Sequence, residues 1–133
     1  MDMTPEFVVL AFTLILAILQ IAAAAIARTA ELGTAWNAGP RDGEQPAPGK
    51  LAGRLLRAQA NLFETLPIFA AAVIMAHVAG KDGVALTLWG THLYLFARVV
   101  YVPLYAFGVT GLRSMAFLAS LAGLIMVIWA LFL

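Results

Sequence analysis

RAQANLFETLPIF, residues 57–69, is a stretch in which polar side chains interrupt an otherwise apolar run. Arg57, Asn61 and Glu64 follow one another at spacings of four and three residues. On a helix of about 3.6 residues per turn, these spacings place all three side chains on one face. A charge at membrane depth costs roughly 2.5–3.5 kcal/mol on insertion scales, so this stripe requires polar partners from the rest of the chain.

The composition predicts an all-α integral membrane protein. Of 133 residues, 63% are hydrophobic and 11% are charged, whereas about a quarter of the residues in a soluble domain are charged. The polar intervals are too short for a soluble lobe, so residues 1–133 are expected to form a single membrane domain. Cysteine is absent, which excludes disulfides, thiolate metal sites and a cysteine nucleophile in the protein itself.

Four apolar segments are each long enough, or nearly so, to cross a hydrocarbon core of about 30 Å. They cover about residues 7–27, 55–78, 84–104 and 115–133. The interval 28–54 contains NAGPRDGEQPAPGK, a cluster of Gly and Pro that favours a loop. The sequence therefore predicts a bundle of four transmembrane helices.

The basic residues predict the orientation of this bundle. The interval 28–54 and its flanks contain Arg28, Arg41, Lys50, Arg54 and Arg57, five of the eight Lys and Arg residues. The turn AGKDG, residues 79–83, has a single Lys. By the positive-inside rule the interval 28–54 is cytoplasmic, and four spans then leave both termini on the periplasmic side.

A second polar stripe occupies the third segment. Arg98, Tyr101 and Tyr105 are spaced by three and four residues and share one helical face. Antiparallel neighbours joined by a short turn bring this stripe to the one that begins at Arg57. Guanidinium groups, one carboxylate and two phenols suit a ligand with several carboxylates and one ammonium group, such as a tripeptide-sized zwitterion of net negative charge.

The stretches RAQANLFETLPIFAAAV and LFARVVYVPLY resemble the MAPEG family, the membrane-associated proteins in eicosanoid and glutathione metabolism. That family includes microsomal glutathione transferases and leukotriene C4 synthase. The stretches AGPRDGEQP and TGLRS are similar to its small bacterial branch. The resemblance therefore implies a bacterial inner-membrane protein whose active site faces the cytoplasm.

The resemblance further implies a homotrimer with glutathione sites between neighbouring subunits. By its motifs, the residues that hold glutathione are Arg57, Asn61, Glu64, Arg98, Tyr101 and Tyr105, with Arg28 as a looser correspondence. An arginine just past the third helix stabilises the thiolate in the family, and Arg113 is the candidate here. A guanidinium beside the sulfur favours the thiolate, which is the nucleophilic form.

Two departures from the leukotriene synthase branch bear on these roles. Thr65 stands where that branch is expected to have a tyrosine, which removes one phenolic contact to the ligand. The interval from Tyr105 to Arg113 is eight residues, one longer than expected. The second departure bears directly on the thiolate role of Arg113.

The function implied by the resemblance is transfer of glutathione to hydrophobic electrophiles, with reduction of lipid hydroperoxides as a second activity. The partners are the lipid bilayer, the hydrophobic substrate and two further copies of the chain, and no nucleic acid or metal is involved. His77 and His92 have no second ligand at metal spacing, so both are interpreted as packing or interface residues.

Two other functions remain alternatives. A non-catalytic membrane subunit could keep the fold and the ligand site without turnover. A small multidrug exporter also has four short helices, but it needs a membrane-embedded carboxylate, usually in the first helix. Segment 7–27 has no acidic residue. Glu64 is outnumbered by arginines in the two stripes, and these would repel a cationic drug.

Overall fold

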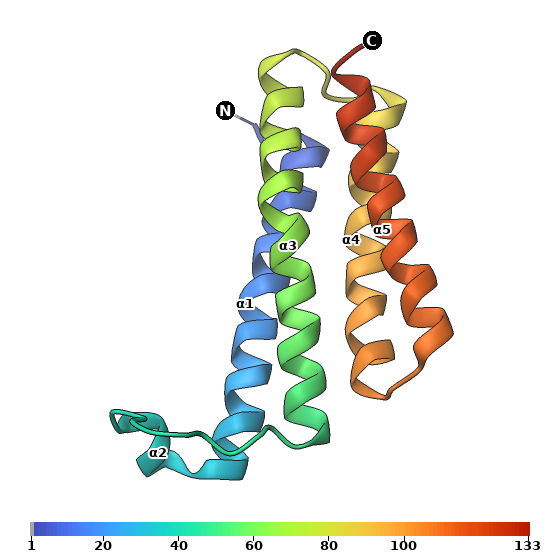
Figure 1. The fold of residues 1–133 in the computed structure, drawn as a ribbon. Coiled ribbons are helices and arrows are strands. Elements are labelled where there is room, and N and C mark those ends of the chain that lie inside the picture. The colour runs from blue at the N-terminus through green and yellow to red at the C-terminus, as the bar shows by residue number, and fades with distance from the viewer. Residues whose placement is uncertain (1) are drawn as a thin grey trace.

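The computed structural model describes residues 2–133, which form long helices joined by short connections. The helices are α1 (Pro5–Leu32), α2 (Thr34–Ala38), α3 (Lys50–Val78), α4 (Ala85–Ala106) and α5 (Thr110–Ala130). Residues 2–133 contain no strand. Figure 1 shows that the four long helices alternate in direction, so the α1–α3 connection and the α4–α5 turn lie at the same end of the bundle. We call this end the loop end.

Local sequence accounts for where α1 begins and ends. The Thr4 hydroxyl accepts a hydrogen bond from the Phe7 backbone N–H at 3.3 Å, and Pro5 occupies the first turn, where its missing N–H costs nothing. At the other end Gly33 takes a φ of 91°, which a side chain would disfavour. The expected segment 7–27 is thus the apolar middle of a longer helix.

The interval expected to be a loop, 28–54, was predicted too long. Helix α1 continues to Leu32, α2 follows, and α3 begins at Lys50, so only residues 39–49 separate α2 from α3. The sequence from Lys50 to Arg57 contains three basic residues, yet most of its residues are good helix formers. An apolar run shows which part of a helix can lie in the hydrocarbon core. The ends of the helix are instead set by capping residues and by Gly and Pro, and they can lie outside that run.

The helices α4 and α5 approach closely through two glycines. A Cβ atom built on Gly123 would lie 2.5 Å from the Gly90 carbonyl oxygen, and one on Gly90 would lie 2.7 Å from the Gly123 carbonyl oxygen. Ser120 and Gly123 of α5 are both buried. Small residues let helix backbones approach in this way within membranes.

The central core joins α1, α3, α4 and α5 around aromatic and aliphatic side chains. Phe69 of α3 stacks on Tyr94 of α4 with ring centroids 3.9 Å apart. The Tyr94 hydroxyl also lies 2.7 Å from the Thr65 hydroxyl, so its polar end is satisfied inside the core. Thr65, the position that departs from the expected tyrosine, therefore makes a core hydrogen bond rather than a surface contact.

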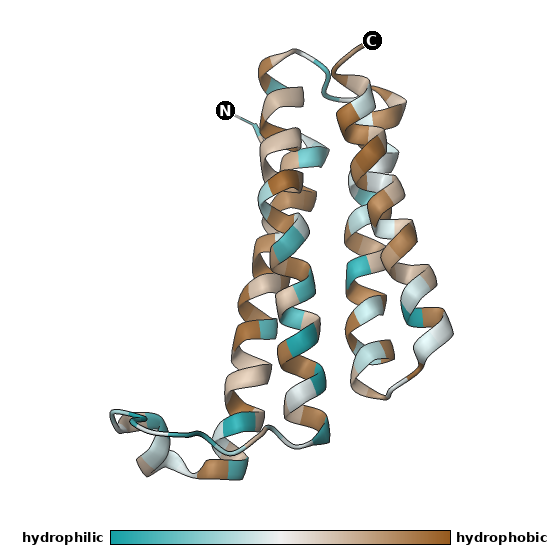
Figure 2. Cartoon of the chain, in the orientation of Figure 1, coloured by the Kyte–Doolittle hydropathy of each residue, from teal (hydrophilic) through white to brown (hydrophobic). Residues whose placement is uncertain are grey.

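Three of the helices are long and apolar enough to cross a membrane: α1, α3 and α5. Their outer surfaces carry large apolar side chains such as Phe12, Ile18 and Leu118, which are more than half exposed in the single chain. Figure 2 shows brown along much of the long helices, with teal on the connection between α2 and α3 and in bands on α3 and α4. Helix α4 contains Arg98 and His92 and is not among the three, so the fourth span stays a prediction.

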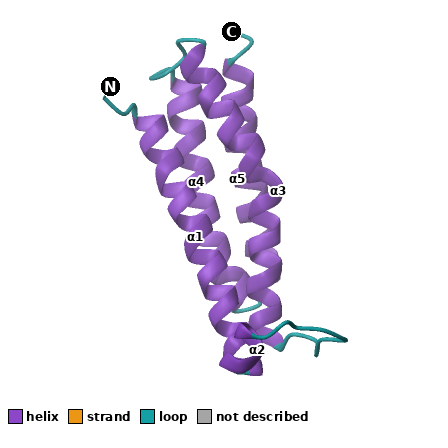
Figure 3. Ribbon diagram, turned by 90° about the vertical axis from the view of Figure 1, so that its left-hand side faces the viewer, coloured by secondary structure: helices purple, strands orange, loops and turns teal. Residues whose placement is uncertain are grey.

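The end of the bundle opposite the loop end is fastened by Glu6, which the sequence reasoning missed. Its Oε1 accepts from the Gly83 backbone N–H at 2.7 Å and from the Thr87 hydroxyl at 3.0 Å. Glu6 is 1% exposed although it lies outside the apolar segment 7–27. It therefore ties the start of α1 to the α3–α4 turn, and Figure 3 shows these parts gathered near the N-terminus, far from α2.

Candidate functional site

The two polar stripes meet near the loop end. The Arg98 Nη1 of α4 donates a hydrogen bond to the Asn61 Oδ1 of α3 at 2.6 Å. One turn closer to the loop end, the Arg57 Nε donates to the Tyr105 hydroxyl at 3.1 Å. The predicted pairing of the stripes on α3 and α4 is thus seen in the side chains, and these two hydrogen bonds set their register.

Stacked aromatic rings and guanidinium groups continue this cluster. Arg98 lies over the Tyr101 ring, with its guanidinium carbon 4.5 Å from the centroid, and Arg57 lies 5.7 Å from the Tyr105 centroid. The Tyr101 and Tyr105 centroids are 5.6 Å apart. Cation–π contacts at these distances hold cations in place without neutralising them.

Arg113 joins the cluster from α5. Its guanidinium carbon lies 4.5 Å from the centroid of the Tyr105 ring. The turn that carries it is fixed by Arg54, whose Nη1 donates to the Ala106 carbonyl oxygen at 3.2 Å. Gly108 has a φ of 74° in this turn, so α5 starts within a few residues of the end of α4. The eight-residue interval therefore still brings Arg113 to the tyrosines.

These residues border an open groove of about 340 Å³ between α3, α4 and α5. It is lined by Asn61, Tyr101, Tyr105, Arg113, Ser114, Phe117 and Leu118. The last three were not singled out from the sequence. Their signal is the helical spacing that follows Arg113, which puts Phe117 on the same face of α5 four residues later.

The electrostatics of the site are dominated by buried and half-buried cations. Arg98 is fully buried, and its Nε and Nη2 have no hydrogen-bond partner among residues 2–133. Asn61, its partner, is uncharged, and no ion pair within the described chain involves Arg57, Arg98 or Arg113. Glu64 is exposed and makes no hydrogen bond there, so the stripe on α3 presents its carboxylate outward.

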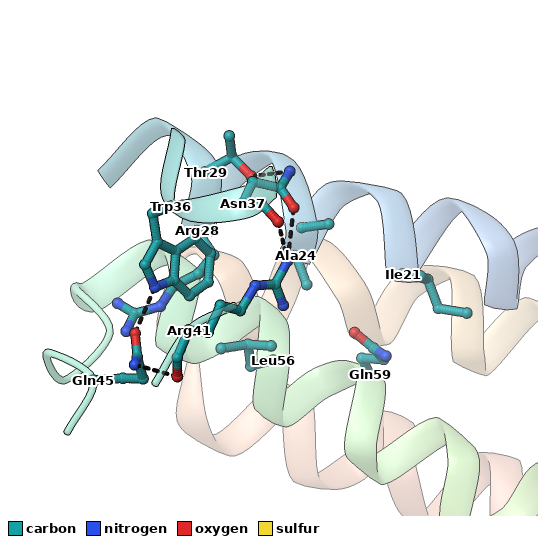
Figure 4. Close-up of a pocket in the computed structure, with 11 residues that line it drawn as sticks. Ile21, Ala24, Arg28, Thr29, Trp36, Asn37, Arg41, Gln45, Leu56 and Gln59 are labelled. Carbon is teal, nitrogen blue, oxygen red and sulfur yellow. Dashed lines mark hydrogen bonds between the residues drawn. The ribbon is translucent and has the colours of Figure 1, made fainter. Parts of the chain in front are cut away.

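Arg28 lies in a different part of the chain from this cluster. Its Nη1 is 2.9 Å from the Glu31 Oε2, and its Nη2 donates to the Pro46 carbonyl oxygen. Figure 4 shows Arg28 beside Trp36 and Arg41 in a second pocket, formed by α1, α2, α3 and the connection between them. The structure brings six of the eight predicted site residues into one cluster on α3, α4 and α5, with Glu64 nearby on α3 but facing outward, and it leaves Arg28 apart.

The two histidines have local partners. The His77 Nδ1 lies 2.6 Å from the Asp82 Oδ2, and its ring packs on Phe7 with centroids 4.4 Å apart. The His92 Nδ1 lies 2.7 Å from the Leu88 carbonyl oxygen, on the exposed side of α4. Within residues 2–133 no three metal-ligating side chains are gathered in one place.

Comparison with known proteins gives the family. No curated protein matches the chain at a significant level. The model of the MAPEG family matches residues 7–133, nearly the whole chain. The match includes all the long helices and both polar stripes, on which the resemblance in the sequence rests. This chain belongs to the MAPEG family.

Proposed function

We propose that this protein is a membrane-bound glutathione transferase that conjugates glutathione to hydrophobic electrophiles and also reduces lipid hydroperoxides. Glutathione lies in the groove between α3, α4 and α5. The proposed contacts are Arg57, Asn61, Glu64, Arg98, Tyr101 and Tyr105, with Arg113 next to the sulfur. Arg28 would reach this ligand only from a neighbouring subunit, and the proposal does not depend on it.

The buried guanidinium of Arg98 carries the proposal. A buried cation with two unpartnered nitrogen atoms is costly unless an anion accompanies it. A carboxylate could accept two parallel hydrogen bonds from such a guanidinium, which is the strongest geometry available to the pair. Glutathione has two carboxylates, so one could neutralise Arg98 while the other meets Arg57.

The exposed carboxylate of Glu64 supports the same ligand. Glutathione has one ammonium group, and Glu64 supplies a negative charge one helical turn from Asn61. A ligand that was purely anionic would be repelled by Glu64, whereas a zwitterion would be oriented by it. The charge pattern therefore favours a molecule with both kinds of group.

Arg113 is proposed to stabilise the thiolate. A thiol with an ordinary pKa of roughly 8.5 is mostly protonated at neutral pH, and a nearby guanidinium favours the ionised form. The stacking on Tyr105 holds the Arg113 guanidinium at the groove without neutralising it. The thiolate sulfur then forms a bond to the electrophilic carbon, and the leaving group departs with its electron pair.

The apolar end of the groove is proposed to admit the second substrate. Phe117 and Leu118 extend the lining along α5, and Leu118 is 61% exposed in the single chain. A lipid-soluble electrophile could therefore approach the sulfur from the bilayer. For a hydroperoxide, the sulfur attacks the distal oxygen and releases an alcohol, after which a second glutathione yields the disulfide and water.

Calorimetry with purified protein tests the proposal. Arg57→Ala and Glu64→Ala should weaken glutathione binding at least tenfold, because each removes a charged contact. Arg113→Ala should still bind glutathione but lose the ultraviolet absorbance of the thiolate. Lys81→Ala removes a charge at the opposite end of the bundle and should change neither quantity.

The other outcomes separate the alternatives. Binding without a thiolate signal in the unmodified protein would favour the non-catalytic subunit. No binding of glutathione at all would mean that the polar stripes only hold the helices together.

A further inference from the structure

Arg54 of α3 joins the helix that carries the first polar stripe to the turn between α4 and α5. It precedes Arg57 by three residues, so it extends the stripe by one helical turn toward the loop end. Its side chain is half-buried and does not line the groove between α3, α4 and α5. Arg54 is therefore not one of the proposed glutathione contacts, although it lies next to them along α3.

The last turn of α4 ends in a Schellman motif. The Gly108 N–H donates to the Tyr105 carbonyl oxygen at 3.1 Å, and the Val109 N–H donates to the Leu104 carbonyl oxygen at 2.9 Å. Gly108 has the positive φ, 74°, that this motif requires. These two bonds satisfy two of the carbonyls at the helix end and leave the carbonyl of Ala106 to be satisfied by a side chain.

The Arg54 guanidinium supplies that donor and also covers the turn. Its Nη1 donates to the Ala106 carbonyl oxygen at 3.2 Å. A Cβ atom built on Gly108 would lie 2.7 Å from the Arg54 Nη2 and 2.9 Å from the guanidinium carbon. The guanidinium therefore packs on the backbone of Gly108, in space that only a glycine leaves open. We call the hydrogen bond and this packing the Arg54 clamp.

The clamp lies close in the chain to Arg113. Only residues 107–109 separate α4 from α5, and the Arg113 N–H donates to the Val109 carbonyl oxygen at 3.3 Å in the first turn of α5. The position of Arg113 thus follows from the position of the turn. Its guanidinium carbon lies 4.5 Å from the centroid of the Tyr105 ring. The clamp ties this arrangement to α3, the helix that supplies Arg57 and its stripe.

We propose that Arg54 is a positioning residue that sets the place of Arg113 against the sulfur of bound glutathione. It acts through the turn and does not touch the ligand. Without the clamp the start of α5 is no longer held against α3, so glutathione still binds through α3 and α4 but its thiol is less ionised. This inference rests on the proposed transferase function and adds to it a residue outside the groove.

The ultraviolet absorbance of the thiolate, measured with saturating glutathione, tests this inference in the intact protein. Arg54→Gln should lower the thiolate fraction at neutral pH about tenfold, because the cation that favours ionisation is no longer held beside the sulfur. A pH titration should show the bound thiol ionising at higher pH than in the unmodified protein. The Kd of glutathione, measured by calorimetry, should change far less than the thiolate fraction.

Gly108→Ala separates position from charge. The added Cβ displaces the Arg54 guanidinium but keeps its charge, so positioning predicts a loss of thiolate similar to that in Arg54→Gln. Gly80→Ala is the matched control, because Gly80 also has a positive φ, 68°, and a Cβ there meets nothing within 4 Å. Both alanines strain the backbone, but Gly80→Ala should keep the thiolate. Lys50→Gln removes an exposed charge from the loop end and should keep it too.

A spin label follows the turn itself without glutathione. The protein has no cysteine, so Gly111→Cys gives a single labelling site in the exposed first turn of α5. A Cβ at Gly111 meets nothing within 4 Å, so the label has open space. Electron paramagnetic resonance should show a more mobile nitroxide in Arg54→Gln and Gly108→Ala, and unchanged mobility in Gly80→Ala.

The opposite results would overturn the inference. A normal thiolate in Arg54→Gln and Gly108→Ala, together with its loss in Arg113→Ala, would remove the positioning role and leave the transferase proposal standing. A loss in Arg54→Gln alone would assign the effect to charge, and equal losses in Gly108→Ala and Gly80→Ala would assign it to backbone strain. Unchanged mobility of the label in Arg54→Gln would show that the turn does not depend on the clamp. An unmodified protein without any thiolate would instead reject the transferase proposal, and this inference with it.

Discussion

Arg98 is the residue on which the proposed site depends most. It is fully buried, donates to Asn61 at 2.6 Å and lies over the Tyr101 ring. A lysine would keep the charge at this position but would lose the planar fork that can meet a neutral amide and a carboxylate at once. The geometry of the guanidinium, in addition to its charge, is therefore expected to matter.

Arg98→Lys is predicted to weaken glutathione binding by about 10- to 100-fold, the range for losing a hydrogen bond to a charged group. Calorimetry on the folded, detergent-solubilised protein measures the change. Arg41→Lys is the matched control, because it replaces another arginine at the loop end that belongs neither to the groove nor to the turn before α5. Equal losses in both variants would contradict a specific role for Arg98.

Tyr105 offers a test that separates binding from activation. Tyr105→Phe removes the hydroxyl that accepts from Arg57 but keeps the ring beside Arg113. We expect KM for glutathione to rise several-fold with kcat nearly unchanged. Tyr105→Leu also removes the ring and should lower kcat and the thiolate absorbance, so identical kinetics for the two variants would argue against this division of roles.

At the scale of elements, the contact between α4 and α5 depends on the absence of a side chain at Gly123. Gly123→Ala would bring a Cβ to 2.5 Å from the Gly90 carbonyl oxygen and 2.8 Å from the Tyr94 backbone nitrogen. Both neighbours are backbone atoms, which cannot rotate away. The two helices would have to separate, and the groove between them and α3 would change shape.

Gly123→Ala is predicted to lower stability by about 1–3 kcal/mol, the usual cost of overpacking, and to lower the Tm measured in detergent. Gly111→Ala is the control within the same helix, because a Cβ there meets nothing within 4 Å. It should be neutral or slightly stabilising, since alanine favours a helix by about 1 kcal/mol over glycine. An unchanged Tm in Gly123→Ala would show that the helices adjust without cost.

Glu6 fastens the start of α1 to the α3–α4 turn in the same way that Arg54 fastens the turn at the loop end. Glu6→Ala would leave the Gly83 N–H without its acceptor and should cost about 1–3 kcal/mol, measured as a lower Tm. Asp2→Ala changes an exposed acid near the same terminus and should have no effect. Similar Tm values for these two variants would remove the structural role of Glu6.

For the whole molecule, the separation of basic residues between the two ends predicts the orientation in the membrane. Arg28, Arg41, Lys50, Arg54, Arg57 and Arg113 lie on elements that reach the loop end, whereas Lys81 lies in the α3–α4 turn at the other end. The positive-inside rule therefore predicts that the loop end, and with it the groove between α3, α4 and α5, faces the cytoplasm.

Reporter fusions after residues 45 and 81 test this orientation. The fusion at 45 should be active with a cytoplasmic reporter, and the fusion at 81 with a periplasmic one. The same preparation, examined by native mass spectrometry, should give a trimer. A periplasmic residue 45 would overturn the predicted orientation and place the groove on the opposite side of the membrane from the one proposed.

The sequence by itself determined the class of the protein and the faces of its helices. Apolar runs of about 20 residues and the spacing of Arg57, Asn61 and Glu64 are local properties, because helical geometry relates residues within a few turns. The family motifs lie in the same short stretches. The long helices lie where the apolar segments predicted them, but their polar ends were misplaced and the short helix α2 was missed.

Only the tertiary structure decided which side chains meet across helices. Arg98 of α4 pairs with Asn61 of α3, and the turn held by Arg54 carries Arg113 to Tyr105. Glu6 is buried against the α3–α4 turn, and Arg28 and Arg41 gather around Trp36. These contacts join residues far apart in the chain, and their geometry depends on how the helices pack as a whole, which no local pattern encodes.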